Sequence, residues 1–194
     1  MSIARVGAIA ICLAAILSMA PPAKALGAPP LIDPHHSSAR FVVHLLRMRA
    51  EGVMTGVTGQ LRGSATSNWQ VLVRVDGRTL RMDGPGWMER VTRSDAFLAI
   101  DTYPAIRFES ESFTDRRLHG GGPLRGQLTL RGLTRPVSFT LLPSGCAHPG
   151  RDCDIQVHGT ISRHAFGMTS HQTLLSDPVD FRIHVRLQAP TVAE

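Results

Sequence analysis

The sequence has almost no lysine. Lys24 is the only one among 194 residues, so arginine supplies nearly all of the 21 basic side chains, and the formal net charge is +6. No run of like charges and no basic stretch interleaved with aromatics appears, which excludes the usual pattern of a nucleic-acid-binding surface. A biased genome explains this arginine usage more simply than a functional arginine array, although a positive sign favours contact with anionic membrane surfaces.

Aromatic residues and long apolar runs are also scarce. The chain has seven Phe, two Trp and one Tyr, too few for the aromatic girdles that a lipid-facing barrel carries at both interfaces. The apolar run at residues 6–20 spans 15 residues and ends at two prolines, whereas a membrane-spanning helix needs roughly 20. The sequence therefore predicts no stable insertion into a membrane.

Residues 1–25 have the pattern of a secretory signal. Arg5 precedes the apolar run, and the tripeptide Ala-Lys-Ala that ends at Ala25 supplies a small-x-small cleavage site. We expect cleavage near Ala25, export to the periplasm and a mature chain of residues 26–194. Without Arg5 and Lys24 the balance is 19 basic against 15 acidic residues, a net charge of +4, and the remaining length suits one domain.

Residues 124–142, LRGQLTLRGLTRPVSFTLL, predict a β-hairpin. Three leucines between 124 and 130 fall on one side of a period-2 run, and Arg, Gln and Thr fall on the other, which is typical of a half-buried strand. Gly132 ends the strand because glycine adopts a positive φ at low cost, and Pro136 suits the start of the returning strand.

The same alternation recurs along the chain and predicts eight strands. A segment without alternation, 83–97, holds Pro85, which can open a short helix that carries Trp87, Met88 and Val91 inward and plugs one end. We therefore expect an all-β fold, an antiparallel eight-stranded up-and-down barrel with a short helical insert. The expected strands are 39–46, 51–61, 69–76, 105–113, 123–130, 137–142, 154–162 and 179–188.

Four stretches resemble the YceI-like family of secreted bacterial, lipocalin-like barrels. They are IDPHHSSARF at 32–41, RSDAFLAIDTYPAIRFES at 93–110, LTLRGLTRPVSF at 128–139, and SRHAFGM with SDPVDFRIHVRL within 162–187. The resemblance spans nearly the whole mature chain. It implies the barrel fold and, since some members hold a long-chain lipid, an isoprenoid, polyprenyl or quinone-like ligand.

An eight-stranded barrel is either filled by its side chains or open for one small ligand. We take the inward apolar residues as candidates for lining the interior and contacting a ligand, with Gly126 and Gly159 as inward positions that lack bulk. The alternative for each of these residues is a purely structural role in a filled core. The candidates are Phe41, Val43, Val71, Val73, Ile106, Phe108, Leu128, Leu130, Phe139, Ile161, Phe181 and Ile183.

Cys146 and Cys153 lie in one polar loop of the mature chain, SGCAHPGRDCD. An exported protein meets an oxidising compartment, so we expect a disulfide that staples a hairpin tip and contributes about 2 kcal/mol. The rival interpretation is a metal pair helped by His148, but zinc sites usually space their cysteines more tightly and need further ligands. We expect no metal site.

Asp33, His36 and Ser37 invite a hydrolase hypothesis, in which His serves as the base for a Ser nucleophile. No G-x-S-x-G turn or oxyanion-hole signature accompanies them. His36 and Ser37 are better explained as hydrogen-bonding residues that tie the amino-terminal segment to the barrel.

These patterns together predict a periplasmic barrel that binds a long apolar ligand in its interior, without a cofactor and without covalent catalysis. The alternative is a structural or stress-response barrel with a filled core, and a hydrolase built on His36 and Ser37 ranks last. The sequence leaves room for a homodimer.

The disulfide yields the first testable prediction. Thiol titration of denatured, unreduced protein that lacks residues 1–25 should find no free thiol, because both remaining cysteines are paired. Two reactive thiols in material taken from the periplasm would contradict the pairing.

Overall fold

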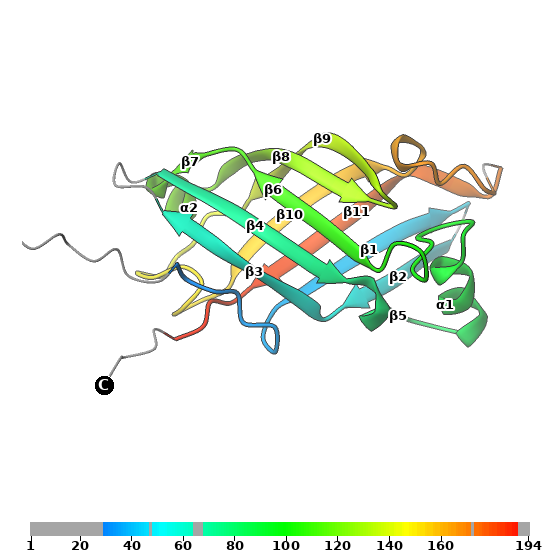
Figure 1. The fold of residues 1–194 in the computed structure, drawn as a ribbon, viewed down its shortest axis with the longest axis horizontal. Coiled ribbons are helices and arrows are strands. Elements are labelled where there is room, and N and C mark those ends of the chain that lie inside the picture. The colour runs from blue at the N-terminus through cyan, green and yellow to red at the C-terminus, as the bar shows by residue number, and fades with distance from the viewer. Residues whose placement is uncertain (1–28, 47, 64–67, 172, 190–194) are drawn as a thin grey trace, which may run out of the picture.

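The structure is a computed structural model that describes residues 29–46, 48–63, 68–171 and 173–189 (Figure 1). The expected secretory signal, with its cleavage site near Ala25, lies outside these residues. In the described part the chain forms one antiparallel sheet that curls into a barrel, with two short α-helices at its ends.

The sheet contains eleven described strands, which run in the order β3, β4, β6, β8, β9, β10, β11, β1, β2 and β5, with β7 paired to β4. Chain neighbours pair nearly throughout, as in an up-and-down barrel, and β1 pairs with β11 from the other end of the chain. The strands are β1 (Ser38–Leu45), β2 (Met48–Met54), β3 (Gly56–Gly63), β4 (Asn68–Asp76), β5 (Arg81–Met82), β6 (Ala105–Ser110), β7 (Phe113–Thr114), β8 (Gly122–Leu130), β9 (Leu133–Leu141), β10 (Ile155–Ser162) and β11 (Leu175–Val185).

The fold class is confirmed, but the described residues form eleven strands rather than the expected eight, and several strand limits differ from those expected. The expected second strand is two strands, β2 and β3, which meet at Thr55; β2 pairs with β1, and β3 pairs with β4. The expected fourth strand likewise divides into β6 and β7. β9 begins at Leu133, so Pro136 lies inside it, and β11 begins at Leu175.

A second connection joins β3 to the far end of β11. The amino-terminal strap, residues 30–33, lies between them: the N–H of Ile32 donates to the carbonyl of Gly59 at 2.9 Å, and the N–H of Asp33 donates to that of Arg186 at 2.8 Å. Leu61 and Gln188 return bonds to carbonyls of the same strap. Edge groups of the sheet are thus paired rather than exposed.

The two ends of the barrel carry different helices (Figure 1). Helix α1 (Gly86–Arg93) forms after Pro85 as expected, but none of its residues is buried and Trp87 is 51% exposed. Trp87, Met88 and Val91 line the interior as expected, but they stay exposed or half-buried at the end of the barrel, so the helix does not plug it. Helix α2 (Asp115–Gly120), which the sequence pattern did not indicate, lies at the other end and buries Leu118.

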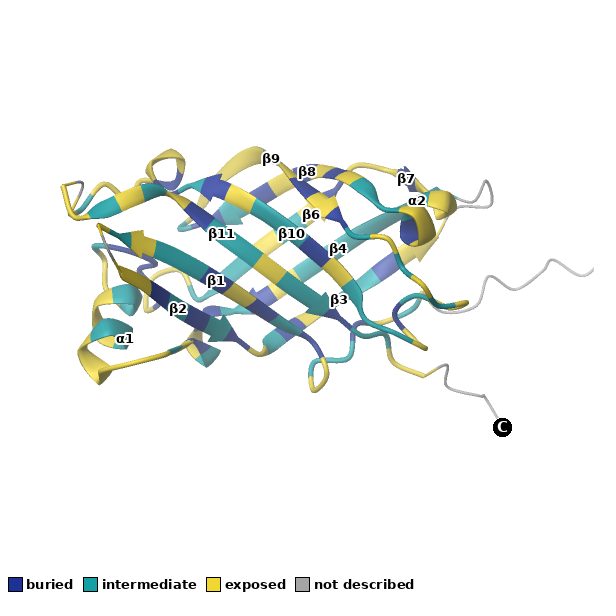
Figure 2. Cartoon of the chain, turned by 180° about the vertical axis from the view of Figure 1, so that it is seen from behind, coloured by how far each residue is buried: buried dark blue, intermediate teal, exposed yellow. Residues whose placement is uncertain are grey.

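Burial alternates along the strands as the period-2 patterns predicted (Figure 2). In β8 the buried positions are Leu124, Gly126, Leu128 and Leu130, and the positions between them are exposed or half-buried. Because successive side chains of a strand point to opposite faces, one face of the whole sheet is apolar and turns inward. This face forms the core cluster.

Gly126 and Gly159 face inward, but neither leaves room for a side chain. A Cβ at Gly126 would lie 2.7 Å from the ring of Phe108 and 2.3 Å from a backbone oxygen, and one at Gly159 would lie 2.2 Å from the ring of Phe139. The two rings contact edge to face with centroids 5.3 Å apart. The expectation of spare space at these glycines is therefore wrong, because aromatic rings occupy it.

Cys146 and Cys153 form a disulfide in the connection between β9 and β10, which confirms the expected pairing. His148 lies in the same loop and contacts Asp152 at 2.9 Å rather than a cysteine. Among the described residues no three His, Cys, Asp or Glu side chains gather closely enough to hold a metal ion.

Two phenylalanines of the inner face should differ in their contribution to stability. Phe139→Ala should lower the free energy of unfolding by about 3 to 5 kcal/mol, since its ring is only 4% exposed and packs on Phe108. Phe181→Ala should cost clearly less, because Phe181 is only partly buried. Urea denaturation measures both, with the outward-facing Arg182→Ala as control. Equal losses for the two phenylalanines would contradict this packing.

Candidate functional site

The barrel encloses one large cavity of about 380 Å³ that runs along its interior. Every long strand contributes apolar side chains to its wall, and nearly the whole wall is hydrocarbon. The twelve residues expected to face the interior all line it: Phe41, Val43, Val71, Val73, Ile106, Phe108, Leu128, Leu130, Phe139, Ile161, Phe181 and Ile183. Contact of these residues with a ligand stays a prediction.

Seven of these twelve residues are only partly buried although they point inward. A side chain in a filled core touches neighbours on all sides and is nearly inaccessible. Partial exposure on the inner face therefore means that these side chains border open space. The seven are Val43, Val71, Val73, Ile106, Phe108, Phe181 and Ile183.

The two ends of the cavity differ in how exposed their lining residues are: the lining is buried at the α2 end, which we call the closed end, and exposed at the other, which we call the open end. Leu118 of α2 lies against the wall at the closed end. At the other end the lining includes Trp87 and Val91 of α1 and Leu174 of the segment before β11, which are 51%, 36% and 50% exposed. Side chains that line a cavity and are also this exposed mark its mouth.

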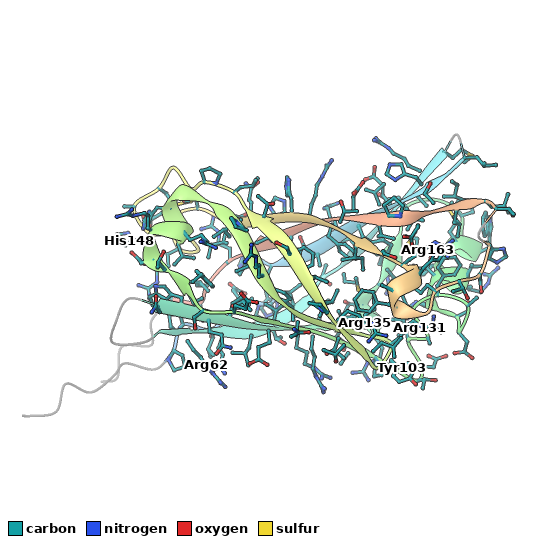
Figure 3. All side chains as sticks on the ribbon, turned by 90° about the horizontal axis from the view of Figure 1, so that it is seen from above. Arg62, Tyr103, Arg131, Arg135, His148 and Arg163 are labelled. Atoms are coloured by element: carbon teal, nitrogen blue, oxygen red, sulfur yellow. A yellow bond between two sulfur atoms is a disulfide. The ribbon has the colours of Figure 1, made fainter. Side chains whose placement is uncertain are left out.

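Arg163 is the one charged residue in the cavity wall. It is 1% exposed, and its guanidinium donates to the backbone carbonyls of Met168, Ser170, Leu175 and Ser176. Within the described part of the chain no carboxylate pairs with it. The side chain thus ties residues 168–170 to residues 175 and 176 at the open end, where Figure 3 shows it opposite the end that carries His148.

Sequence reasoning missed Arg163, although a signal exists. Val157, Gly159 and Ile161 are the inward positions of β10, so the same period of two places Arg163 inward directly after the strand ends. An arginine at an inward position is rare without partners. The four carbonyls supply those partners and explain the residue.

The remaining polar residues of the wall also belong to the open end. Thr92 of α1 donates to the carbonyl of Met88 at 2.8 Å. His171 stacks on Phe97 with centroids 6.2 Å apart and planes 11° apart. The interior is therefore apolar along its length and polar only near its mouth.

The structure separates the residues of the hydrolase hypothesis. His36 Nδ1 lies 2.7 Å from Asp33 Oδ2, and the hydrogen bond from this ring, with one from the N–H of His35, lowers the pKa of the Asp33 carboxyl. The hydroxyl of Ser37 instead accepts from the N–H of Arg186 at 2.9 Å. Ser37 thus ties the amino-terminal segment to the end of β11, and no described hydrogen bond joins it to His36.

A comparison with models of known protein families identifies the family of this chain. A family model described as the YceI-like domain matches residues 31–187. The chain belongs to the YceI-like family. No curated protein matches it, and no helix among the described residues is long and apolar enough to cross a membrane.

Three solved structures share the barrel at low sequence identity. BcnA from Burkholderia cenocepacia is 16% identical, with a TM-score of 0.66 over 81% of this chain and 99% of that one. A polyisoprenoid-binding domain from Saccharophagus degradans, implicated in plant cell wall breakdown, is 13% identical, with a TM-score of 0.62 over 84% and 99%. The YceI protein of Campylobacter jejuni is 18% identical, with a TM-score of 0.58 over 75% and 89%. At these identities the likeness shows the fold alone.

Arg163 should be essential for the order of the open end of this YceI-like barrel. Arg163→Met should lower the free energy of unfolding by about 2 to 3 kcal/mol, because buried carbonyls lose their donors, and should speed amide hydrogen exchange in residues 168–176. Arg163→Lys should restore only part of the stability, since an ammonium cannot span four carbonyls. The exposed Arg182→Met is the control, expected within about 0.5 kcal/mol of wild type. If Arg163→Met changed neither the free energy of unfolding nor the amide exchange, Arg163 would not have this role.

Proposed function

We propose that the protein is an exported carrier that binds one long-chain apolar ligand, an isoprenoid or a similar lipid, inside the barrel without covalent catalysis. The observation that carries this proposal is the open, almost wholly apolar cavity of about 380 Å³. Its volume falls within the roughly 300 to 1,000 Å³ typical of small-molecule sites.

The chemistry of the wall favours a hydrocarbon chain over a polar ligand. Along the interior no side-chain donor or acceptor is offered by the lining residues of the strands, so a polar ligand would lose its hydrogen bonds to water without replacement. A hydrocarbon chain gains about 0.8 kcal/mol for each buried CH₂, offset by the cost of ordering the chain.

The distribution of polarity suggests how such a ligand lies. Thr92, Arg163 and His171 are the polar lining residues, and all three belong to the open end. An apolar tail would therefore enter toward Leu118 and leave its polar terminus near the mouth. A quinone or polyprenyl lipid has this division between tail and head.

The family assignment supports the same function. The related domain from Saccharophagus degradans is described as binding polyisoprenoid. Export of this chain rests on the signal pattern of residues 1–25, and the disulfide of Cys146 and Cys153 suits the oxidising compartment that export implies.

A structural barrel with a filled core is the second candidate. Its support is the close packing of Phe108 and Phe139 over the two glycines. The seven partly buried inward residues favour a cavity instead, since a filled core would bury them.

Blocking the cavity tests the proposal. Val73 points inward from the middle of β4 and is only partly buried, whereas Leu72 beside it lies outside the lining. Val73→Trp should weaken titrated geranylgeraniol binding by about tenfold or more, because the ring takes space that the chain needs, while the matched Leu72→Trp should bind like wild type.

Melting temperature and lipid extraction separate the two candidates. With a cavity, Val73→Trp melts close to wild type and loses ligand. With a filled core, overpacking costs about 1 to 3 kcal/mol, and native mass spectrometry of protein from its own host, followed by organic extraction, finds no lipid. That second pair of results would contradict the carrier function.

A further inference from the structure

The exposed apolar side chains gather at one end of the barrel. The described residues include eight large hydrophobic or aromatic side chains that are exposed. Seven belong to segments at the open end, and Leu31 of the strap is the exception (Figure 1). The eight are Leu31, Leu46, Met48, Trp87, Val91, Tyr103, Leu133 and Leu174.

Five of these side chains surround the mouth of the cavity, and we name them the apolar rim. Leu46 and Met48 flank the tip of the β1–β2 hairpin, Trp87 and Val91 lie one turn apart on α1, and Leu174 precedes β11. Their exposed fractions are 79%, 68%, 51%, 36% and 50%. The pairing of Leu45 with Leu175 brings the hairpin tip beside the segment of Leu174.

The apolar rim continues the cavity wall. Trp87, Val91 and Leu174 line the cavity and are also exposed, while Leu46 and Met48 are exposed and lie outside the lining. Apolar side chains thus extend from the cavity wall to the outside at the mouth, beside the polar lining residues Thr92 and His171. Contiguous exposed apolar surface of this kind marks an interaction site.

We propose that the apolar rim docks the open end of the barrel on the surface of a lipid bilayer. A ligand chain that leaves through the mouth meets the rim next, and a bilayer receives both the rim and the chain. A rigid protein partner seated on the rim would cover the exit. This choice of occupant rests on the proposed lipid ligand, whereas the docking itself does not need a bound ligand.

The composition of the rim suits the membrane interface. Trp87 has an apolar ring with one polar N–H, the amphipathic form that is enriched at the level of lipid headgroups. On α1, Trp87 and Val91 are four residues apart and share one face, and Arg90, three residues after Trp87, lies at the edge of that face. A short helix with an apolar face and arginines beside it lies in the plane of an interface.

The charges near the rim are weakly positive. The segment 81–93 carries three arginines, at 81, 90 and 93, and two carboxylates, at 83 and 89. Glu89 pairs with both Arg81 and Arg93, at 3.4 and 3.3 Å. Apolar insertion is therefore the main contribution, and anionic lipid should add a modest, salt-sensitive one.

Vesicle binding by the mature protein tests the docking. Wild type should sediment with vesicles of phosphatidylethanolamine and phosphatidylglycerol and less well with phosphatidylcholine alone. The double variant Leu46→Asn with Met48→Ser should lose roughly tenfold of this binding, because both side chains leave the interface. Its geranylgeraniol titration should match wild type, since neither residue lines the cavity. Leu31→Ser, at the other end, should bind vesicles like wild type.

A second measurement locates the rim in the bilayer. In a Trp69→Phe background, Trp87 is the remaining tryptophan of the chain, and brominated lipid should quench its fluorescence. Wild type that ignores vesicles, an unquenched Trp87, or equal losses in Leu31→Ser and the double variant would overturn the proposal. The proposal would also fail if wild type formed a dimer and bound no vesicles, and if the double variant were monomeric. Vesicle binding without isoprenoid uptake would refute the carrier function and leave the docking intact.

Discussion

The structure depends on the closure of a sheet that has one apolar face and no partner layer to cover it. Such a sheet must bury that face against itself. The chain bends at Thr55 between β2 and β3. β2 pairs with β1 and β3 pairs with β4, so one continuous segment supplies strands near both ends of the curled sheet. The amino-terminal strap then pairs with Gly59 and with Arg186 across the remaining gap. Without the bend the inner face would be open to water.

Closure alone would allow the interior to fill, and the placement of glycine explains why it does not. Gly52, Gly126 and Gly159 lack a Cβ where the rings of Phe41, Phe108 and Phe139 lie on the neighbouring strands. The large rings therefore lie along the wall. The residues left to reach the axis are mainly aliphatic, such as Val71 and Val73, and these are too short to meet across it.

The period-2 alternation predicted most of the strands and all twelve residues of the inner wall. It could do so because successive side chains of a strand point to opposite faces, so the apolar positions of one strand share one face. It could not place the division at Thr55, since the glycines around it weaken the pattern equally on both sides. Helix α2 offers a single apolar residue, Leu118, in a polar hexamer, so no helical period was visible. The space beside Gly126 and Gly159 is filled by phenylalanine rings from neighbouring strands, and the sequence around each glycine does not reveal this.

The same physics makes the two ends of the barrel unequal, and this inequality connects fold to function. The disulfide loop and α2 lie at one end, where the lining residue Leu118 is buried. At the other end Arg163 binds the backbone of Met168, Ser170 and Leu175, while Leu46, Met48 and Trp87 expose apolar side chains nearby. A fixed segment beneath an apolar, exposed rim is the arrangement that the proposed lipid ligand would need at the mouth of the cavity. The buried arginine supports this mouth through the backbone carbonyls that it binds.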